Sequence, residues 1–401
     1  MIKVALLGFG VVGSGCAEVL TQNKDLIKAK VGDDVEIKYV LDLRDFPDSP
    51  FADRIVHDFK VIANDPEIAI VAEMMGGSHP AYEFTKACLE AGKSVVTSNK
   101  EVVANFGTEL LALAAAHGVS YLFEASVGGG IPVLRSIYVD LAGNRIGEVN
   151  GILNGTTNYI LTSMKQSGTS FADALKKAQE LGYAEANPAA DVEGLDAARK
   201  TAILCGLCFG KLVSPADIHT EGITAISGTD VSDAAEMGYA IKLIGHADVT
   251  DGKITALVSP RFVPATNPLS GISDVFNGVL LKGDMVGEVM FYGPGAGKLP
   301  TASAVVGDII DVASGIGGTV KRPYFANATA EDVADFADYT CARYFRFANT
   351  VDEVNAALDD NVQQMLAKDG YVSVITTGLS ERNAVALVAD KLTVLSSMRV
   401  L

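Results

Sequence analysis

The chain has no long hydrophobic run and few basic residues, and both shortages restrict what it can do. No apolar stretch approaches the ~18 residues that a membrane helix needs, and the N-terminus enters a strand pattern rather than a signal peptide. Lysine and arginine total 32 against 49 acidic residues, which gives a net charge of −17. We therefore expect neither nucleic acid nor a membrane as a partner. A phosphate-bearing ligand must then bind through backbone dipoles and a few lysines.

Cysteine and histidine are also scarce. Five cysteines, an odd number without regular spacing, predict reduced thiols in a cytoplasmic protein. Cys205 and Cys208 form a C-x-x-C, but they lie in an apolar helical run and are interpreted as small core residues. The five histidines lack ligand spacing, which argues against zinc. At 401 residues and 49% hydrophobic content, the chain is long enough for two or three domains with cores.

The N-terminus carries a dinucleotide-binding pattern. A strand pattern at 2–7 leads into a G-x-G-x-x-G sequence, and a helix is expected from Val12 to about Leu26. The first glycine permits a tight turn, the second lets the backbone approach a pyrophosphate, and the third lets helix and strand pack closely. The cofactor-binding residues that this pattern predicts are Gly8, Gly10, Val11, Val12 and Gly13.

Asp42 ends the second predicted strand, which runs over 35–41. It is further from the glycines than usual, because a polar insertion at 23–34 precedes the strand. An acidic residue there would bind the ribose hydroxyls and repel a 2′-phosphate, whereas Arg44 could accept one. The cofactor is therefore NAD or NADP.

The alternation of strand and helix patterns continues to Glu124. Strands are expected at 68–75, 93–97 and 119–124, and helices at 80–91 and 101–117. This rhythm predicts an α/β fold with a Rossmann-type, doubly wound parallel sheet, whose ligand site lies at the carboxyl ends of the strands. Ser98 and Lys100 follow such an end. A lysine at a helix start is unfavourable against the helix dipole, so Lys100 is interpreted as a ligand contact rather than an ordinary surface lysine.

Beyond Glu124 the pattern becomes that of a mixed α+β domain. A glycine-rich bend at 125–132 is interpreted as the hinge into it. A strand at 147–153 leads to a turn at 154–158, which suits a small polar substrate, or is a plain helix cap by Thr156 or Thr157. Gly297 ends a glycine-rich segment before a helix at 300–314, and this helix start could pack back onto the cofactor.

The segment from Gly182 to Lys200 concentrates charge just before an apolar helix. Its punctuation by proline and glycine predicts a loop that feeds a helix starting near Leu195. Asp196 and Lys200, four residues apart, share one face of that helix. The pair is either a solvated ion pair or a lysine held by carboxylates in a partly dry pocket, where it can donate and recover a proton. The second alternative is the working hypothesis.

These residues carry a family resemblance: the chain resembles homoserine dehydrogenase from Ile2 to about Ser314. The family's signature matches at Ala178, Gly182, Asn187, Pro188, Asp191, Gly194, Asp196 and Lys200, and 98–100 and 154–158 agree as well. The resemblance implies reversible oxidation of L-homoserine to L-aspartate 4-semialdehyde with NAD(P), in threonine, methionine and isoleucine biosynthesis.

The resemblance also implies residue roles. Lys200 would be the proton donor, and Lys100 would lie beside substrate and nicotinamide. The residues that would bind or organise the substrate are Glu185, Asp191, Asp196, Lys100 and Thr156. Which carboxylate contacts the substrate and which orients Lys200 is open. A sodium or potassium ion would lie at Glu124, Val127, Gly129 and Ile131. Leu41 stands where many members have an arginine, which removes a candidate for binding a 2′-phosphate.

The tail shows a β-α-β-β-α-β pattern over 339–400 and resembles the ACT regulatory domains of bacterial homoserine dehydrogenases. It lacks the usual glycine and acidic residues between the first strand and helix, so it is expected to serve dimerisation rather than threonine sensing. The predicted domains are 1–130 for dinucleotide binding (with about 300–320 packing on it), 131–300 for substrate and dimerisation, and 335–401 for the tail. A homodimer or homotetramer is expected.

Two other functions remain. One is a Rossmann dehydrogenase of another small hydroxy acid or semialdehyde. The other is a catalytically idle nucleotide-sensing protein. The joint presence of Lys100, Glu185, Asp196 and Lys200 argues against the second, because a sensor needs no proton-transfer set.

Overall fold

The computed structural model describes residues 1–315, 322–389 and 391–401. Its contacts divide the chain into two compact units. The first consists of 1–145, 202–214 and 291–327, and the second of 146–201, 215–290 and 328–401. These units are clusters of contacts, so the predicted domain limits stay a prediction. The end of the segment expected to pack on the first domain, residues 316–320, lies outside the described residues.

The first unit contains a six-stranded parallel sheet in the order β3-β2-β1-β4-β5-β6, the strand order of dinucleotide-binding folds. The strands are β1 (Ile2–Leu7), β2 (Val35–Leu41), β3 (Ile55–Val56), β4 (Ile68–Glu73), β5 (Ser94–Thr97) and β6 (Tyr121–Leu122). The helices are α1 (Val11–Gln22), α2 (Lys24–Val31), α3 (Lys60–Ala63), α4 (Ala81–Glu90), α5 (Lys100–Ala116), α6 (Leu134–Tyr138) and α12 (Lys298–Ser314). The Rossmann-type sheet is therefore confirmed.

The expected single helix to Leu26 was wrong at its end. Helix α1 stops at Asn23, whose φ of −100° and ψ of 20° are not helical, and α2 starts again at the next residue. The polar insertion is thus mostly a second helix. It forms because Ile27 and Val31 provide apolar contacts with the core, while the charged residues around them stay in solvent.

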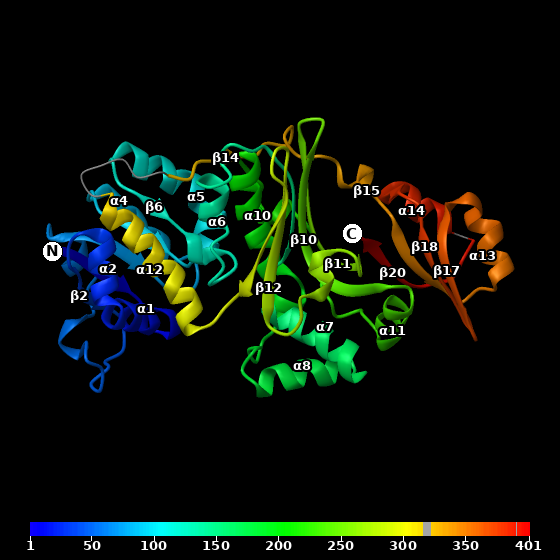
Figure 1. Ribbon diagram of the computed structural model, residues 1–401, viewed down its shortest axis with the longest axis horizontal. Coiled ribbons are helices and arrows are strands. Elements are labelled where there is room, and N and C mark those ends of the chain that lie inside the picture. The colour runs from blue at the N-terminus through cyan, green and yellow to red at the C-terminus, as the bar shows by residue number, and fades with distance from the viewer. Residues whose placement is uncertain (316–321, 390) are drawn as a thin grey trace. The chain divides into compact units, whose positions relative to one another are not determined.

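Helix α12 packs beside α1 on the first unit's sheet (Figure 1). Val305 and Ile309 of α12 join the same buried cluster as Leu6 of β1. The close approach depends on Gly15 of α1, because a Cβ there would lie 2.7 Å from the carbonyl oxygen of Lys298. A helix from late in the chain thereby completes the core of the N-terminal fold.

The second unit is built on a ten-stranded sheet in the order β13-β12-β7-β10-β11-β20-β16-β18-β17, with β9 paired to β11; the last part of β13, from Phe291 on, is assigned to the first unit. The strands are β7 (Ile146–Ile152), β9 (His219–Thr220), β10 (Tyr239–Thr250), β11 (Lys253–Pro264), β12 (Phe276–Gly283), β13 (Gly287–Pro294), β16 (Arg343–Phe347), β17 (Val362–Lys368), β18 (Tyr371–Thr376) and β20 (Val394–Val400). The helices are α7 (Gly155–Ser167), α8 (Phe171–Glu180), α9 (Ala189–Val192), α11 (Gly228–Glu236), α13 (Val351–Leu358) and α14 (Glu381–Val388), together with the start of α10 (Leu195–Phe209).

Four strands of the tail, β16, β17, β18 and β20, have with α13 and α14 the predicted β-α-β-β-α-β order, and they continue the sheet of the second unit (Figure 1). Strand β20 joins the two parts, because it pairs with both β11 and β16. The predicted first strand of the tail is divided at Ala342 into β15 (Thr340–Cys341) and β16, and β15 pairs with β19 (Leu379–Ser380). Residue 390, the end of the last predicted helix, lies outside the described residues.

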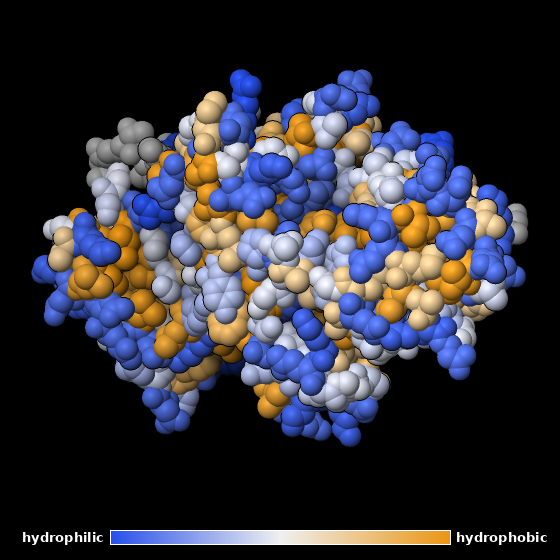
Figure 2. All heavy atoms as spheres, turned by 45° about the vertical axis from the view of Figure 1, so that its right-hand side comes forward, coloured by the Kyte–Doolittle hydropathy of each residue, from blue (hydrophilic) through white to orange (hydrophobic). Residues whose placement is uncertain are grey.

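Hydrophilic residues cover much of the face shown in Figure 2, and apolar residues gather between them in patches. In the described part of the chain, every helix is too short or too polar to span a membrane. Cys205 is buried and Cys208 half-buried in α10, in agreement with their interpretation as core residues.

Candidate active site

The glycine turn after β1 has the geometry that its sequence predicts. Gly8 has a φ of +93°, which favours glycine, and a Cβ on Gly13 would overlap the carbonyl oxygen of Gly8. At Gly10 no atom of the described residues lies within 4 Å of where a Cβ would stand. The turn is therefore closed on the side of the strand and open above Gly10, as phosphate binding at the start of α1 requires.

Asp42 lies at the edge of a cavity of about 490 Å³ that Gly8 and Gly10 also line. Its carboxylate accepts a hydrogen bond of 2.8 Å from the backbone N–H of Phe9 and pairs with Arg44 at 3.0 Å. Burial works to raise the pKa of Asp42, but the bonds from Arg44 and Phe9 outweigh it and lower the pKa to about 2. An ionised acceptor thus faces the nucleotide cavity.

A buried carboxyl group that the sequence analysis missed lies at the end of β4. Glu73 is fully buried and accepts hydrogen bonds from Thr97 Oγ1 at 2.5 Å and from the backbone N–H of Met75 at 2.7 Å. Burial raises the pKa of Glu73 to about 7, although these bonds oppose the shift. Its other neighbour, Asn99, caps α5 through the backbone N–H groups of Glu101 and Val102. The only sequence signal was an acidic residue closing an apolar strand.

Ser98 and Lys100 follow β5 at the strand end where they were expected. The backbone N–H of Ser98 donates to the carbonyl of Glu73, and Lys100 is the first residue of α5. Gly297 precedes α12 with a φ of +119°. It does not line the cavity beside Asp42. The structure therefore groups Gly8, Gly10 and Asp42, while Gly297 belongs to a different turn of the same unit.

The turn expected to hold a cation is tightly bent. Gly128 and Gly129 both have positive φ, and a Cβ on Gly129 would overlap the carbonyl group of Gly295. The carboxylate of Glu124 is occupied by the backbone N–H groups of Leu134 and Arg135. The turn is therefore left with main-chain carbonyl oxygens as donors, the ligand type suited to a hard cation.

Lys200 is buried in the second unit, in the first turns of α10. Its Nζ lies 2.7 Å from Asp196 Oδ2 and 2.7 Å from the carbonyl oxygen of Leu153. Both side chains of the pair are about nine-tenths buried, with 11% and 7% exposed. The solvated ion pair, which was the alternative, is therefore wrong: the ammonium group lies in a dry environment, where the Asp196 carboxylate and the Leu153 carbonyl are among its partners.

Asn154 connects the acidic residues around Lys200. Its Nδ2 donates to Asp191 Oδ1 at 2.7 Å and to Asp196 Oδ2 at 2.9 Å. Its Oδ1 accepts from the backbone N–H of Thr157 at 2.9 Å and caps α7. The cap is thus Asn154 rather than Thr156 or Thr157. An asparagine before a helix was the signal that could have identified it.

Of the other predicted substrate residues in this unit, Thr156 is buried and hydrogen-bonded, whereas Glu185 is at the surface. Thr156 Oγ1 donates to the carbonyl of Tyr183 at 2.5 Å, so it fixes the loop before α9. Glu185 is exposed, and its carbonyl accepts a bond from Gln179. Gly194 has a φ of +86° and lets the chain turn from α9 into α10. The structure brings Asp191, Asp196 and Lys200 together through Asn154, and leaves the Glu185 side chain at the surface.

A Rossmann-type glycine turn beside an ionised carboxylate, together with a buried lysine bonded to a carboxylate, is typical of a nicotinamide-nucleotide-dependent dehydrogenase. Residues 8–124 match the NAD-binding domain of homoserine dehydrogenase, and residues 132–310 match the homoserine dehydrogenase family. The homoserine dehydrogenase of Synechocystis sp. is 44% identical over 80% of this chain and 76% of its own length. The chain belongs to the homoserine dehydrogenase family.

Solved structures agree. A homoserine dehydrogenase from Thiobacillus denitrificans superposes with a TM-score of 0.91 at 35% identity, over all of this chain and 98% of the other. A hyperthermophilic archaeal homoserine dehydrogenase mutant in complex with NADPH gives a TM-score of 0.67 at 27% identity, over 80% of this chain and 99% of the other. The predicted family, fold class and nicotinamide nucleotide cofactor are confirmed, and the roles of single residues stay predictions.

Proposed function

We propose that Lys200 is the proton donor and acceptor when this homoserine dehydrogenase interconverts L-homoserine and L-aspartate 4-semialdehyde. One observation supports the assignment above all others: a buried ammonium group hydrogen-bonded to Asp196 and to the Leu153 carbonyl, at the end of the family's signature. A buried cation beside a reacting oxygen can stabilise developing negative charge and transfer a proton.

The reaction divides into a hydride and a proton. A nicotinamide nucleotide held at Gly8, Gly10 and Asp42 would supply the acceptor for the hydride from the terminal carbon of homoserine, or the donor of a hydride to the aldehyde. In the oxidation, neutral Lys200 takes the hydroxyl proton as the C=O bond forms. In the reduction, its ammonium group gives a proton to the carbonyl oxygen. In both the oxidation and the reduction, the Asp196 carboxylate stabilises the protonated form of Lys200. The amide of Asn154 donates a hydrogen bond to Asp196 and so keeps this carboxylate in place.

The substrate's α-ammonium group needs a carboxylate, and we assign this role to Asp191 with Glu185. Asp191 is half-buried and already oriented by Asn154, whereas Glu185 is exposed and free to turn toward a ligand. Lys100 and Thr156 complete the proposed substrate set. A sodium or potassium ion would be held by main-chain carbonyls at Glu124, Val127, Gly129 and Ile131, where it would stiffen this glycine-rich turn.

The choice between NAD and NADP depends on Asp42. Its ionised carboxylate is suited to the ribose hydroxyls of NAD, and Arg44, which lines the same cavity, is paired with Asp42. Kinetics with both cofactors for the wild type and Asp42→Ala test this role. A shift of preference toward NADP is expected in the variant. An unchanged preference would remove Asp42 from cofactor selection.

The experiment for Lys200 follows nicotinamide absorbance with L-homoserine and each cofactor, for the wild type, Lys200→Ala and the surface control Lys176→Ala. General acid–base groups contribute ~10²–10⁴-fold, so Lys200→Ala should lose turnover by that factor while cofactor binding, followed by fluorescence, is retained. Lys176 is exposed in α8 and its variant should match the wild type. Near-normal turnover in Lys200→Ala would remove Lys200 from the mechanism.

We also propose a cytoplasmic homodimer or homotetramer in which the tail supports assembly. The support is the tail's incorporation into the large sheet of the second unit. Light scattering of the chain with and without residues 335–401 tests this, because loss of the tail should lower the measured mass to that of a smaller assembly. An unchanged mass would leave the tail without this role.

A further inference from the structure

Glu73, at the end of β4, is a fully buried carboxyl group whose hydrogen-bond partners among the described residues are neutral. Its oxygens accept from Thr97 Oγ1 at 2.5 Å, from the backbone N–H of Met75 at 2.7 Å and, at 3.5 Å, from Asn99 Nδ2. Burying an acidic group is costly, and buried acidic groups with shifted pKa values cluster at functional sites. The partners of Glu73 therefore identify the part of the first unit on which it acts.

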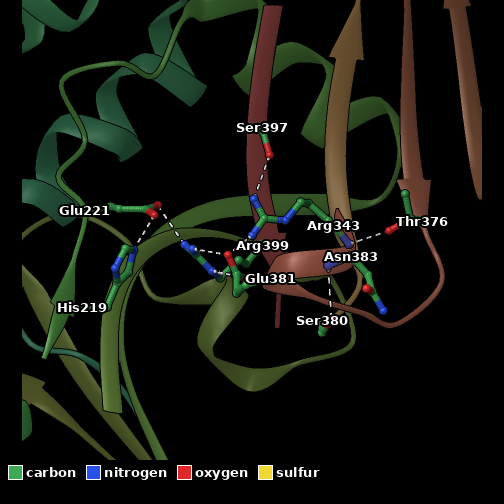
Figure 3. Close-up of polar contacts among 9 residues, drawn as sticks. All are labelled: His219, Glu221, Arg343, Thr376, Ser380, Glu381, Asn383, Ser397 and Arg399. Atoms are coloured by element: carbon green, nitrogen blue, oxygen red, sulfur yellow. Dashed lines mark hydrogen bonds and ion pairs between the residues drawn. The ribbon is translucent and has the colours of Figure 1, made fainter. Parts of the chain in front are cut away.

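Glu381 of α14 shows how the same chain stabilises a buried carboxylate that supports the fold. It is bound by two arginines (Figure 3): Arg399 donates from Nε at 2.8 Å and from Nη2 at 2.9 Å, and Arg343 donates from Nη2. Burial works to raise the pKa of Glu381, but the bonds from the two arginines outweigh it and lower the pKa. At Glu73 neutral donors stand in place of the arginines, and burial raises its pKa to about 7. Fold stability alone does not favour such a group.

Asn99 links this carboxyl group to two segments of the first unit. Its Nδ2 donates to the carbonyl oxygen of Gly77 at 2.7 Å and to that of Met75 at 3.3 Å. Its Oδ1 accepts from two backbone N–H groups in the first turn of α5, and its own backbone N–H donates to Thr97 Oγ1 at 2.9 Å. Asn99 thus fixes the segment after β4 and the start of α5, where Lys100 is the first residue.

The segment after β4 is a wall of the nucleotide cavity. Met74, Met75 and Gly76 line this cavity of about 490 Å³. The segment also lies against the glycine turn, because a Cβ on Gly8 would stand 3.0 Å from the carbonyl oxygen of Met74. The backbone N–H of Met75 is the group that donates to Glu73. The carboxyl group therefore holds the main chain of a cavity wall from its buried side.

We propose that Glu73 is a positioning residue for the nicotinamide nucleotide. Through Thr97 and Asn99 it holds the cavity wall at 75–77 and the start of α5 in a fixed relative position. The inference rests on the proposed cofactor site beside Asp42. Small displacements of groups that hold a reacting ligand are costly, so the loss of one bond in this network should weaken cofactor binding.

Thr97 allows a test that leaves the carboxyl group in place. Thr97→Val has nearly the same shape but loses the hydroxyl that donates to Glu73 and accepts from Asn99, whereas Thr97→Ser keeps it. In steady-state kinetics of the full chain with L-homoserine, Thr97→Val should raise the cofactor's KM about fivefold or more. The dissociation constant of the reduced cofactor, measured by fluorescence, should rise in parallel. Thr97→Ser should stay near the wild-type values.

Thr85→Val is the matched control. Thr85 of α4 is fully buried, and its hydroxyl makes no hydrogen bond to any of the described residues, so the variant should keep the wild-type KM for the cofactor. A protein that is only less stable has fewer active molecules, which lowers the apparent kcat and leaves KM unchanged. An unchanged cofactor KM and dissociation constant in Thr97→Val, or an equal rise in Thr97→Ser, would overturn the proposal.

Glu73→Gln is a second, independent variant. It keeps the size of the side chain but has one acceptor oxygen in place of two, so the cofactor's KM should rise about threefold or more. Asp42→Ala separates this inference from the cofactor site on which it rests. If Asp42→Ala changes the cofactor preference while Thr97→Val and Glu73→Gln keep the wild-type KM, the site stands and the positioning role is wrong. If all three variants behave as the wild type does, both are wrong.

Discussion

Among the described residues of the second unit, two lysines are buried, Lys200 and Lys242. Their hydrogen-bond partners differ, and this difference shows how a buried ammonium group is stabilised. Lys200 is hydrogen-bonded to the carboxylate of Asp196 and to a carbonyl. Lys242 of β10 is equally buried, but its Nζ bonds the amide oxygen of Asn158 and the carbonyl of Ile272. One lysine has an anionic partner, whereas among the described residues the other has neutral acceptors for its hydrogen bonds.

This difference decides how strongly each ammonium group is held. Burial lowers the pKa of Lys242 to about 8, and the nearby Lys165 contributes in the same direction. A carboxylate in contact, as at Lys200, offsets the cost of burying the charge. A contacting carboxylate therefore stabilises the buried ammonium group of Lys200, and this carboxylate, Asp196, belongs to the family's signature.

The largest effect is expected when Lys200 is deprived of its partner. Asp196→Asn removes the carboxylate that contacts the buried ammonium group, and breaking this buried pair should cost about 3–5 kcal/mol in the free energy of unfolding. Urea denaturation measures it, with Asp360→Asn, at an exposed position, as the control. A loss below 1 kcal/mol would mean that water or another group replaces the carboxylate, and the contrast with Lys242 would not hold.

A smaller effect, dependent on pH, is expected at Lys242. Between pH 8 and 10.5 the unfolded chain binds more protons than the folded one, so this lysine makes the free energy of unfolding rise with pH. The rise amounts to about 3 kcal/mol over that interval at most. It should appear as a changing difference between the wild type and Lys242→Met in urea titrations across this pH range, with Lys176→Met as control. A constant difference would contradict the lowered pKa.

The smallest effect on stability is expected at Asn154, where two roles can be separated. Asn154→Ser keeps an oxygen to cap α7 but loses the amide donor to Asp191 and Asp196, whereas Asn154→Ala loses both. The Ala variant should be about 1 kcal/mol less stable than the Ser variant. Both should lose turnover by about tenfold or more, because small displacements of catalytic groups are costly. Normal activity in Asn154→Ser would show that Asp191 and Asp196 are placed without it.

Local signals made the cofactor end of the fold predictable. The sequence pattern alone predicts why glycine is needed at 8, 10 and 13. The structure agrees at two of these positions: Gly8 has a positive φ, and a Cβ on Gly13 would overlap the carbonyl oxygen of Gly8. The pairing of Asp196 with Lys200 is likewise a matter of helical spacing. The start of α10 at Leu195 was also predicted from a local signal, because a glycine directly before it interrupts the chain.

Other features could not be predicted because their partners are far apart in the chain. Asn154 donates hydrogen bonds to Asp191 and Asp196, which are 37 and 42 positions later in the chain. The sequence of the turn around Asn154 does not predict these contacts. Glu73 ends an apolar strand, and its raised pKa depends on burial between β1 and β5, which lie on both sides of β4. The joining of the tail to the sheet through β11 and β20 depends on tertiary packing rather than on strand propensity.

The way β20 meets β11 has a consequence for how the second unit opens. Strands β11 and β20 pair over a short ladder, Arg261 with Arg399 and Phe262 with Val400. The ladder between β10 and β11 is much longer and runs along the whole of both strands. Sheets open most easily where the hydrogen-bond ladder is shortest. Amide protons of the tail should therefore exchange with deuterium as a block of their own, earlier than those of the long hairpin, so that the continuous sheet behaves in solution as two cooperative pieces.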